Sequence, residues 1–179
     1  MIPFSPPRRF NSVMISFSPP RIDQKVIDEV VDTLKSGWIT TGPKTKEFER
    51  RLTAYCGNRA TLAVNSNTVG LEVVLRWFGV QEGDEVIVPA YTYCATANVI
   101  VHCGAKPVMV DVNADDFDVC LEKVRVAITD KTKVIMPVDL GGMPCAYDEL
   151  FELVEAEGVK ALFQAKTEEQ KKLGRILIL

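Results

Sequence analysis

The chain has 179 residues, of which 47% are hydrophobic and 25% are charged, and this composition is typical of one globular domain with a sizeable core. A formal net charge of −3 disfavours nucleic acid as the main partner. No apolar run approaches the roughly 20 residues that span a bilayer, and no apolar signal segment follows Arg8 and Arg9, so we expect a cytoplasmic protein without membrane contact.

The first 21 residues contain a proline-rich motif twice. IPFSPPR at residues 2–8 recurs as ISFSPPR at residues 15–21. Adjacent prolines disfavour a helix and favour an extended chain. The sequence therefore predicts an N-terminal arm over residues 1–21 and a domain over residues 22–179. We interpret residues 1–13 as a leader that precedes a natural start at Met14, and a functional repeat is the alternative.

Two helices are expected before residue 59. Residues 23–36 carry apolar side chains at helical spacing, and Gly37 supplies a stop signal. Residues 44–56 form the second helical pattern, which ends at Gly57. The segment 38–43 between them is expected to be a loop because it ends in glycine and proline.

From residue 59 onward, apolar runs alternate with helical patterns. Strands are expected at residues 60–64, 85–88, 107–111, 133–138 and 175–179. Helices are expected at residues 69–79, 94–103, 117–128 and 146–172, the last of them broken near Gly158. Because the strand candidates are continuously apolar and alternate with helices, the sequence predicts an α/β fold with a mostly parallel sheet buried on both faces.

A polar turn follows the first expected strand, at residues 65–68. It leads into a helix near Val69, so Ser66, Asn67 or Thr68 can serve as the N-cap. Unpaired N–H groups at the start of a helix attract anions. The residues by themselves are equally consistent with a phosphate site and with a capped helix that has no ligand.

Aromatic and acidic residues follow three further strands. Tyr91 and Tyr93 come after strand 85–88, where one ring can form a flat platform for a planar ligand. The alternative is that both rings pack against the helix layer. Asp111 and Asp139 end two other strands, where a carboxylate serves either as a ligand contact or as a cap of the following loop.

The cysteines and the histidine favour structural roles. The five cysteines are widely spaced, without a CxxC motif, and we interpret them as small buried hydrophobic residues in a reducing cytosol. The single histidine, His102, lies in an apolar helical pattern and is expected in the core. This composition predicts neither a metal site nor a Ser-His triad. The charged segment 166–172 is expected to be a solvated helix face.

Six short segments occur in a characteristic order. They are WITTGP at 38–43, SNTVGL at 66–71, GDEVIVP at 83–89, TYCATAN at 92–98, PVMVDV at 107–112 and the turn at 137–142. In this order and spacing they resemble the DegT/DnrJ/EryC1/StrS aminotransferases, over about residues 15–179. The resemblance implies an incomplete large domain of a fold-type-I, pyridoxal-phosphate-dependent transferase, a three-layer α/β structure that ends before its last strands.

The resemblance also implies a cofactor site. Pyridoxal 5'-phosphate (PLP) is the implied cofactor, and its phosphate is assigned to the turn at Asn67, Thr68 and Val69. Tyr93 matches the aromatic position whose ring stacks on the pyridine of the cofactor. Asp139 stands where many members of the family have histidine, so it receives no role from the resemblance.

The loop 38–43 resembles the segment that lines the sugar site near a dimer interface. Trp38, Thr40 and Thr41 are therefore expected to bind substrate. The implied substrates are a nucleotide-linked keto sugar and, as amino donor, glutamate. The implied assembly is a homodimer with its active site at the interface. The implied biological context is surface polysaccharide or amino-sugar biosynthesis.

The residues that would carry the chemistry are expected beyond Leu179. In the family, a lysine that moves the substrate proton and an aspartate that binds the pyridine nitrogen follow the strand at 175–179. No catalytic residue is therefore assigned, and these 179 residues alone are expected to be inactive. The alternative is a non-catalytic remnant that binds cofactor or nucleotide sugar, or that pairs with another subunit.

The strand at 60–64 has a further implication for folding. In fold-type-I enzymes the corresponding strand pairs with strands that come late in the sequence. Without them its backbone donors and acceptors lack partners. We therefore expect the 179-residue chain to be marginally stable, aggregated or dependent on a partner chain, and a cooperative, monomeric thermal transition would contradict this.

Overall fold

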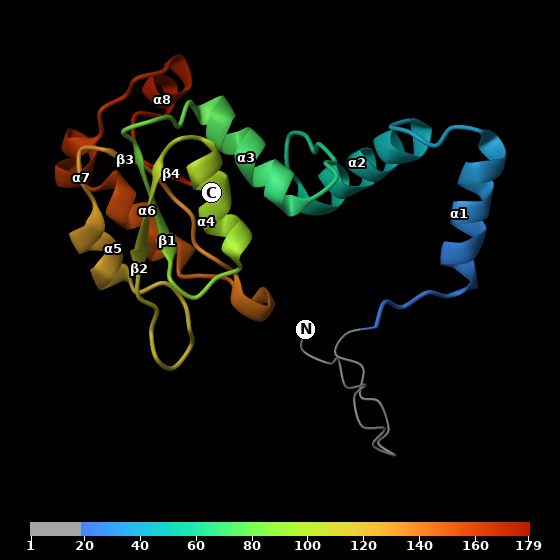
Figure 1. The fold of residues 1–179 in the computed structure, drawn as a ribbon, viewed down its shortest axis with the longest axis horizontal. Coiled ribbons are helices and arrows are strands. Elements are labelled where there is room, and N and C mark those ends of the chain that lie inside the picture. The colour runs from blue at the N-terminus through green and yellow to red at the C-terminus, as the bar shows by residue number, and fades with distance from the viewer. Residues whose placement is uncertain (1–18) are drawn as a thin grey trace, which may run out of the picture. The chain divides into compact units, whose positions relative to one another are not determined.

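The computed structural model describes residues 19–179, which divide into one unit up to Ala63 and a second from Val64 onward (Figure 1). The expected leader at residues 1–13 and most of the proline-rich repeat lie outside the described residues. The expected boundary between residues 21 and 22 therefore stays a prediction.

The first unit contains the two expected helices, α1 (Gln24–Ser36) and α2 (Pro43–Cys56). Asp23 caps the start of helix α1, because its carboxylate accepts a hydrogen bond from the N–H of Val26 at 3.2 Å. It ends at Gly37, whose φ of +72° is the left-handed conformation that glycine adopts without strain. Both helices lie within one residue of their predicted bounds.

The strand expected at residues 60–64 does not form. Within residues 19–179 no strand pairs with this segment. Side chains of α2 bond to two of its polar groups, and the first of these bonds runs from the N–H of Ala63 to the Glu49 carboxylate at 2.9 Å. The hydroxyls of Thr53 and Thr61 also form a hydrogen bond, at 2.8 Å. An apolar run becomes a strand only where a neighbouring strand is available to pair with it.

The second unit is built on a parallel sheet. Its order is β2-β1-β3-β4, and each of the three pairings is parallel. The strands overlap four of the expected segments; β1, β2 and β3 each extend one residue beyond theirs, and β3 and β4 are shorter than predicted. Their bounds are β1 (Glu85–Pro89), β2 (Lys106–Val110), β3 (Thr132–Ile135) and β4 (Leu177–Ile178).

Helices connect and follow these strands. They are α3 (Asn67–Phe78), α4 (Cys94–His102), α5 (Leu121–Ala127), α6 (Tyr147–Glu155), α7 (Glu157–Leu162) and α8 (Glu168–Leu173), with a 3-10 turn η1 (Leu140–Gly142). The helix expected at 146–172 is three helices, and its first break falls at Ala156, where the backbone is extended, rather than at Gly158. A second break follows α7 at Phe163, which packs against both hydrophobic cores.

The sheet separates two cores, as a three-layer α/β fold requires. Val86 and Val88 of β1 point to the face covered by α3 and α4. Ile87, between them in sequence, points to the opposite face, which α5 and α6 cover. Figure 1 shows α3 and α4 on one side of the sheet and α5 and α6 on the other. This alternation explains why β1 contains the uninterrupted apolar run 86–88, whereas Met109 of the edge strand β2 stays exposed.

Two cysteines and the histidine differ from their predicted burial. Cys103 and Cys145 are buried, but Cys56 and Cys94 are exposed, so the interpretation of the cysteines as buried residues is wrong for these two. Both exposed cysteines occupy helix ends, the last residue of α2 and the first residue of α4. A terminal residue has no following or preceding helical turn that would cover it.

The expectation that His102 packs in the core is also wrong. Its side chain is 55% exposed, and its Nδ1 lies 3.1 Å from a carboxylate oxygen of Glu72 on α3. Val99 and Ile100 turn the apolar face of α4 toward the core. His102 therefore lies at the helix end, outside that face.

We expect alkylation with iodoacetamide at about pH 8 to modify Cys56 and Cys94 first. Burial raises the pKa of the Cys145 thiol to about 12, and burial also raises the pKa of Cys103. Both therefore stay protonated, and only the thiolate reacts quickly. Peptide mass spectrometry over a time course measures the order. Modification of Cys145 as fast as of Cys94 would contradict the burial described.

Candidate functional site

The second unit brings two helix starts to the carboxyl edge of its sheet. Strand β1 ends at Pro89, and residues 90–93 lead directly into α4. The connection 79–84 joins the end of α3 to the start of β1, so α3 begins toward the same edge as α4. The two helices pack against each other (Figure 1). In open α/β sheets, ligands bind at this edge.

The start of α3 offers free hydrogen-bond donors. The N-cap is Ser66, whose Oγ accepts a hydrogen bond from the N–H of Val69 at 3.2 Å. Within residues 19–179, the backbone N–H groups of Asn67 and Thr68 have no acceptor. Of the three residues expected at a phosphate, two therefore present free backbone donors, and the donor of Val69 is already used by the cap.

The charge around these helix starts suits an anion. The first turns of α3 and α4 contain no acidic residue, whereas those of α5, α6, α7 and α8 each contain at least one. A carboxylate in the first turn competes with an external anion for the positive end of the helix dipole. Helices α3 and α4 leave that end available.

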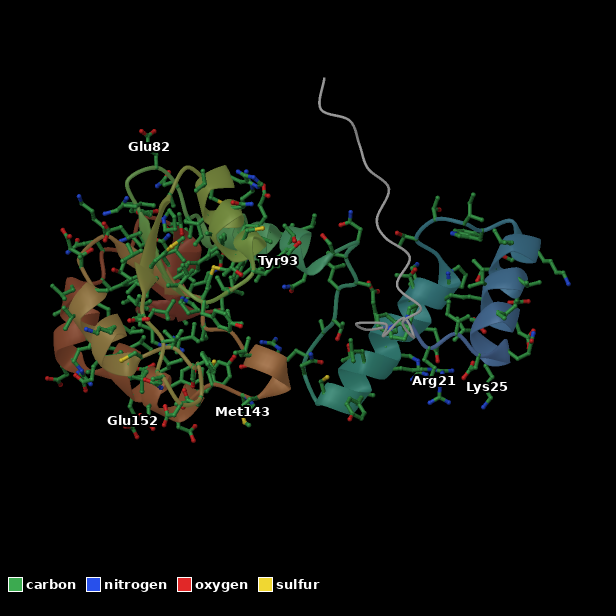
Figure 2. All side chains as sticks on the ribbon, turned by 60° about the horizontal axis from the view of Figure 1, so that its bottom comes forward. Arg21, Lys25, Glu82, Tyr93, Met143 and Glu152 are labelled. Atoms are coloured by element: carbon green, nitrogen blue, oxygen red, sulfur yellow. The ribbon has the colours of Figure 1, made fainter. Side chains whose placement is uncertain are left out.

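Tyr93 is the most exposed aromatic residue at this edge. It is the N-cap residue of α4, and the residue is 79% exposed. Figure 2 shows it at the margin of the second unit. The alternative that both tyrosines pack against the helix layer is therefore wrong for Tyr93. Tyr91 contacts the ring of Phe117, at a centroid distance of 5.5 Å. A pocket of about 380 Å³ is lined by residues 91–93 and 138–141.

The two aspartates that were expected at strand ends bond to nearby loop groups, although β3 ends at Ile135 and only Asp111 directly follows a strand. Asp139 accepts hydrogen bonds from the N–H of Cys145 at 3.1 Å and from the hydroxyl of Tyr147 at 3.0 Å. The hydrogen bond from the Cys145 backbone, assisted by that of Tyr147, lowers the pKa of Asp139. Asp111 accepts from the N–H of Val112, at 2.9 Å. Of the two alternatives for these residues, a ligand contact and a loop cap, the structure favours the loop cap.

The loop 38–43 forms its own pocket in the first unit. Trp38 and Thr40 line this pocket, which has a volume of about 270 Å³. The indole Nε1 of Trp38 donates to the carbonyl of Thr41 at 3.0 Å. A Cβ on Gly42 would lie 2.3 Å from that nitrogen, so only glycine leaves room for the tryptophan ring. Thr41 therefore does not line the pocket, and its carbonyl instead holds the Trp38 side chain in position.

Two residues near these pockets were not expected from the sequence. Lys44 also lines the loop pocket, and its Nζ lies 2.6 Å from Glu29 and 2.8 Å from Asp32. The second is Phe117, an apolar residue within an acidic turn (residues 115–118, DDFD). An isolated aromatic residue in an acidic turn was the one sequence feature that could have pointed to Phe117.

Comparison with known proteins identifies the family. The sequence model of the DegT/DnrJ/EryC1/StrS aminotransferase family matches residues 20–166. The chain belongs to this family. Its enzymes are PLP-dependent, and their fold-type-I architecture agrees with the parallel three-layer sheet described above.

Relatives of this aminotransferase family match the chain over much of its length. An uncharacterized protein of Methanocaldococcus jannaschii is 45% identical over 141 residues, which are 77% of this chain and 36% of the relative. Spr1654 of Streptococcus pneumoniae, described as a sugar aminotransferase, is 54% identical with a TM-score of 0.88, and the match covers 92% of this chain and 41% of that one. It has been solved in apo, PMP and PLP forms.

A third solved structure is also similar to the chain. The 3-amino-5-hydroxybenzoic acid (AHBA) synthase is 37% identical with a TM-score of 0.71, and the match covers 75% of this chain and 35% of that protein. The chain thus spans about two fifths or less of the length of these three relatives.

Proposed function

We propose that the chain is the N-terminal part of a PLP-dependent aminotransferase that acts on a nucleotide-linked keto sugar, with glutamate as amino donor. The observation that carries this proposal is the pair of free N–H groups at the start of α3, at the same sheet edge as the exposed Tyr93. The description of Spr1654 as a sugar aminotransferase supports the sugar substrate. We further propose a cytoplasmic homodimer that serves surface polysaccharide or amino-sugar biosynthesis.

Residues of this chain would hold the cofactor at its phosphate and at its pyridine ring. The N–H groups of Asn67 and Thr68 would donate to its phosphate, and the dipole of the twelve-residue α3 favours that charge. The ring of Tyr93 would lie against the pyridine and limit the access of water to it. When bound, PLP supplies a carbonyl carbon that accepts amino groups and a ring that withdraws electrons.

Other residues would have supporting roles in the first unit. Trp38 and Thr40 would contact the sugar nucleotide, and Thr41 would keep the indole in place through its carbonyl. No residue of this chain is assigned to proton transfer. We propose that the lysine and the pyridine-binding aspartate belong to the part of the parent protein that this chain does not span.

The proposal is tested by mixing the 179-residue chain with PLP, reducing with borohydride and locating any adduct by mass spectrometry. We expect reversible binding of PLP in equilibrium dialysis and no adduct at a single specific lysine. Pyridoxal, which lacks the phosphate, is the matched control and should bind more weakly. A specific adduct on one lysine of this chain would overturn the proposal that the catalytic lysine belongs to the part of the parent protein that this chain does not span. Equal binding of PLP and pyridoxal would overturn the phosphate site.

The proposed stacking gives a separate prediction for Tyr93. We expect Tyr93→Ala to weaken PLP binding by up to about tenfold, because an aromatic contact of this kind contributes about 0.5–1.5 kcal/mol. Tyr93→Phe keeps the ring and should bind PLP like the wild type. Equilibrium dialysis gives both dissociation constants. An unchanged affinity in Tyr93→Ala would remove Tyr93 from the site.

A further inference from the structure

Phe117 has an unusual backbone conformation. Its φ is +61°, and among residues 19–179 it is the only non-glycine residue with positive φ. Large side chains rarely adopt this left-handed conformation, because the Cβ approaches the backbone too closely. Such a residue persists where its surroundings hold it, and these positions cluster at functional sites.

Backbone hydrogen bonds hold the loop around Phe117 in place. The N–H of Phe117 donates to the carbonyl of Asn113 at 3.2 Å, and the N–H of Asn113 donates to the carbonyl of Asp118 at 2.9 Å. Val112 and Val119 close the loop through an antiparallel bridge. The loop therefore presents the Phe117 side chain from a closed turn that begins just after β2.

The ring of Phe117 meets Tyr91 at the carboxyl edge of the sheet. The two centroids are 5.5 Å apart and the rings are tilted by 41°, an arrangement that aromatic pairs favour. Both residues are about half exposed, 49% for Phe117 and 56% for Tyr91, and neither belongs to either core. Tyr91 belongs to the loop 90–93, which also carries Tyr93, and both tyrosines line the same pocket.

We propose that Phe117 is a positioning residue for the aromatic loop 90–93. Its ring holds Tyr91, and Tyr91 in turn restricts the short segment that ends in Tyr93. The left-handed conformation of Phe117 is the cost of aiming its ring at that loop. The inference rests on the proposed cofactor site, since the purpose of the restraint is to keep the Tyr93 ring ready for the pyridine of PLP.

Phe117→Gly separates positioning from folding. Glycine adopts positive φ without strain, so this variant removes the ring while keeping the loop backbone. Phe117→Ala removes the ring but keeps the unfavourable conformation, and Phe117→Tyr keeps the ring. Far-UV circular dichroism should show that all three retain the fold. We expect Phe117→Gly and Phe117→Ala to weaken PLP binding by roughly twofold to tenfold. Phe117→Tyr should bind PLP like the wild type.

A second measurement does not depend on the cofactor. The chain has four tyrosines, so labelling with 3-fluorotyrosine gives four fluorine NMR signals, which Tyr→Phe variants assign. Without PLP, we expect Phe117→Gly to shift or narrow the signals of both Tyr91 and Tyr93, and to leave those of Tyr55 and Tyr147 unchanged. A change at Tyr91 alone would mean a local packing contact and would overturn the proposal.

The two measurements also distinguish this inference from the proposed function. If the wild type fails to bind PLP while the Tyr93 signal responds to Phe117→Gly, the positioning role is supported and the proposed cofactor site fails. If the wild type binds PLP and Phe117→Gly changes neither the Tyr93 signal nor the dissociation constant, the positioning role fails and the cofactor site stands.

Discussion

Replacing Lys166 with methionine is expected to lower the free energy of unfolding of the second unit by about 3 kcal/mol. The Nζ of Lys166 lies 2.6 Å from a carboxylate oxygen of Asp84, whose side chain is fully buried just before β1. Methionine keeps most of the side-chain volume but removes the cation that contacts the buried carboxylate. Asp84 then keeps the hydrogen bond from the N–H of Gln81 at 3.1 Å and the charge of the buried Lys133 nearby. This expected loss of stability lies at the low end of the range for breaking a buried ion pair, because the Lys166 side chain is itself 40% exposed.

Hydrogen exchange of the β1 and β3 amides measures this loss of stability, since these central strands exchange through the larger opening reactions. Lys171→Met is the matched control. Its Nζ also lies 2.8 Å from a carboxylate, that of Glu168, but both side chains are more than half exposed. A surface pair of this kind contributes about 0–1 kcal/mol. Equal effects of the two substitutions would show that the burial of Asp84 does not matter.

The second large effect is expected for Asn67→Pro, which should weaken PLP binding by about tenfold to a hundredfold. Asn67 is the first residue of α3, a position where proline is well tolerated. The preceding Ser66 is extended, with φ −160° and ψ 156°, as a residue before proline should be. The substitution thus preserves the helix and removes one free donor, and hydrogen bonds to charged groups contribute about 1.5–3 kcal/mol.

Asn67→Ala is the control for this substitution, because it removes the side chain and keeps the backbone N–H. We expect its affinity for PLP to stay close to that of the wild type in equilibrium dialysis. Circular dichroism should show unchanged helix content in both variants. Similar losses in Asn67→Pro and Asn67→Ala would mean that the side chain, and not the backbone donor, meets the phosphate.

Much of the second unit follows from local sequence signals. The run at residues 86–88 is apolar on both of its faces, and only a strand between two helix layers buries both. The polar turn before Val69 predicts a capped helix start, which the structure has at Ser66. The position of Tyr93 in the short segment between a strand and the next helix places it at the carboxyl edge. These features depend on neighbours in sequence, so they are readable without a tertiary structure.

Other features depend on contacts between distant residues. The segment 60–64 has the composition of a strand, but two of its polar groups bond to side chains of α2 and no described strand pairs with it. Whether an apolar run becomes a strand depends on a neighbour that the run itself does not encode. Lys166 looks like part of a solvated charged face, and only the fold brings it to the buried Asp84, which lies 82 positions earlier.

The sequence by itself determined the fold class, the family and the two helix starts that meet at the carboxyl edge, because periodicity, caps and ordered motifs are local properties. Only the tertiary structure decided which donors of α3 are free and that Tyr93 is exposed. It also decided that Phe117 reaches Tyr91 from a strained turn. These features arise from the relative positions of separate loops, which depend on how the strands pair and how the helices pack across the sheet.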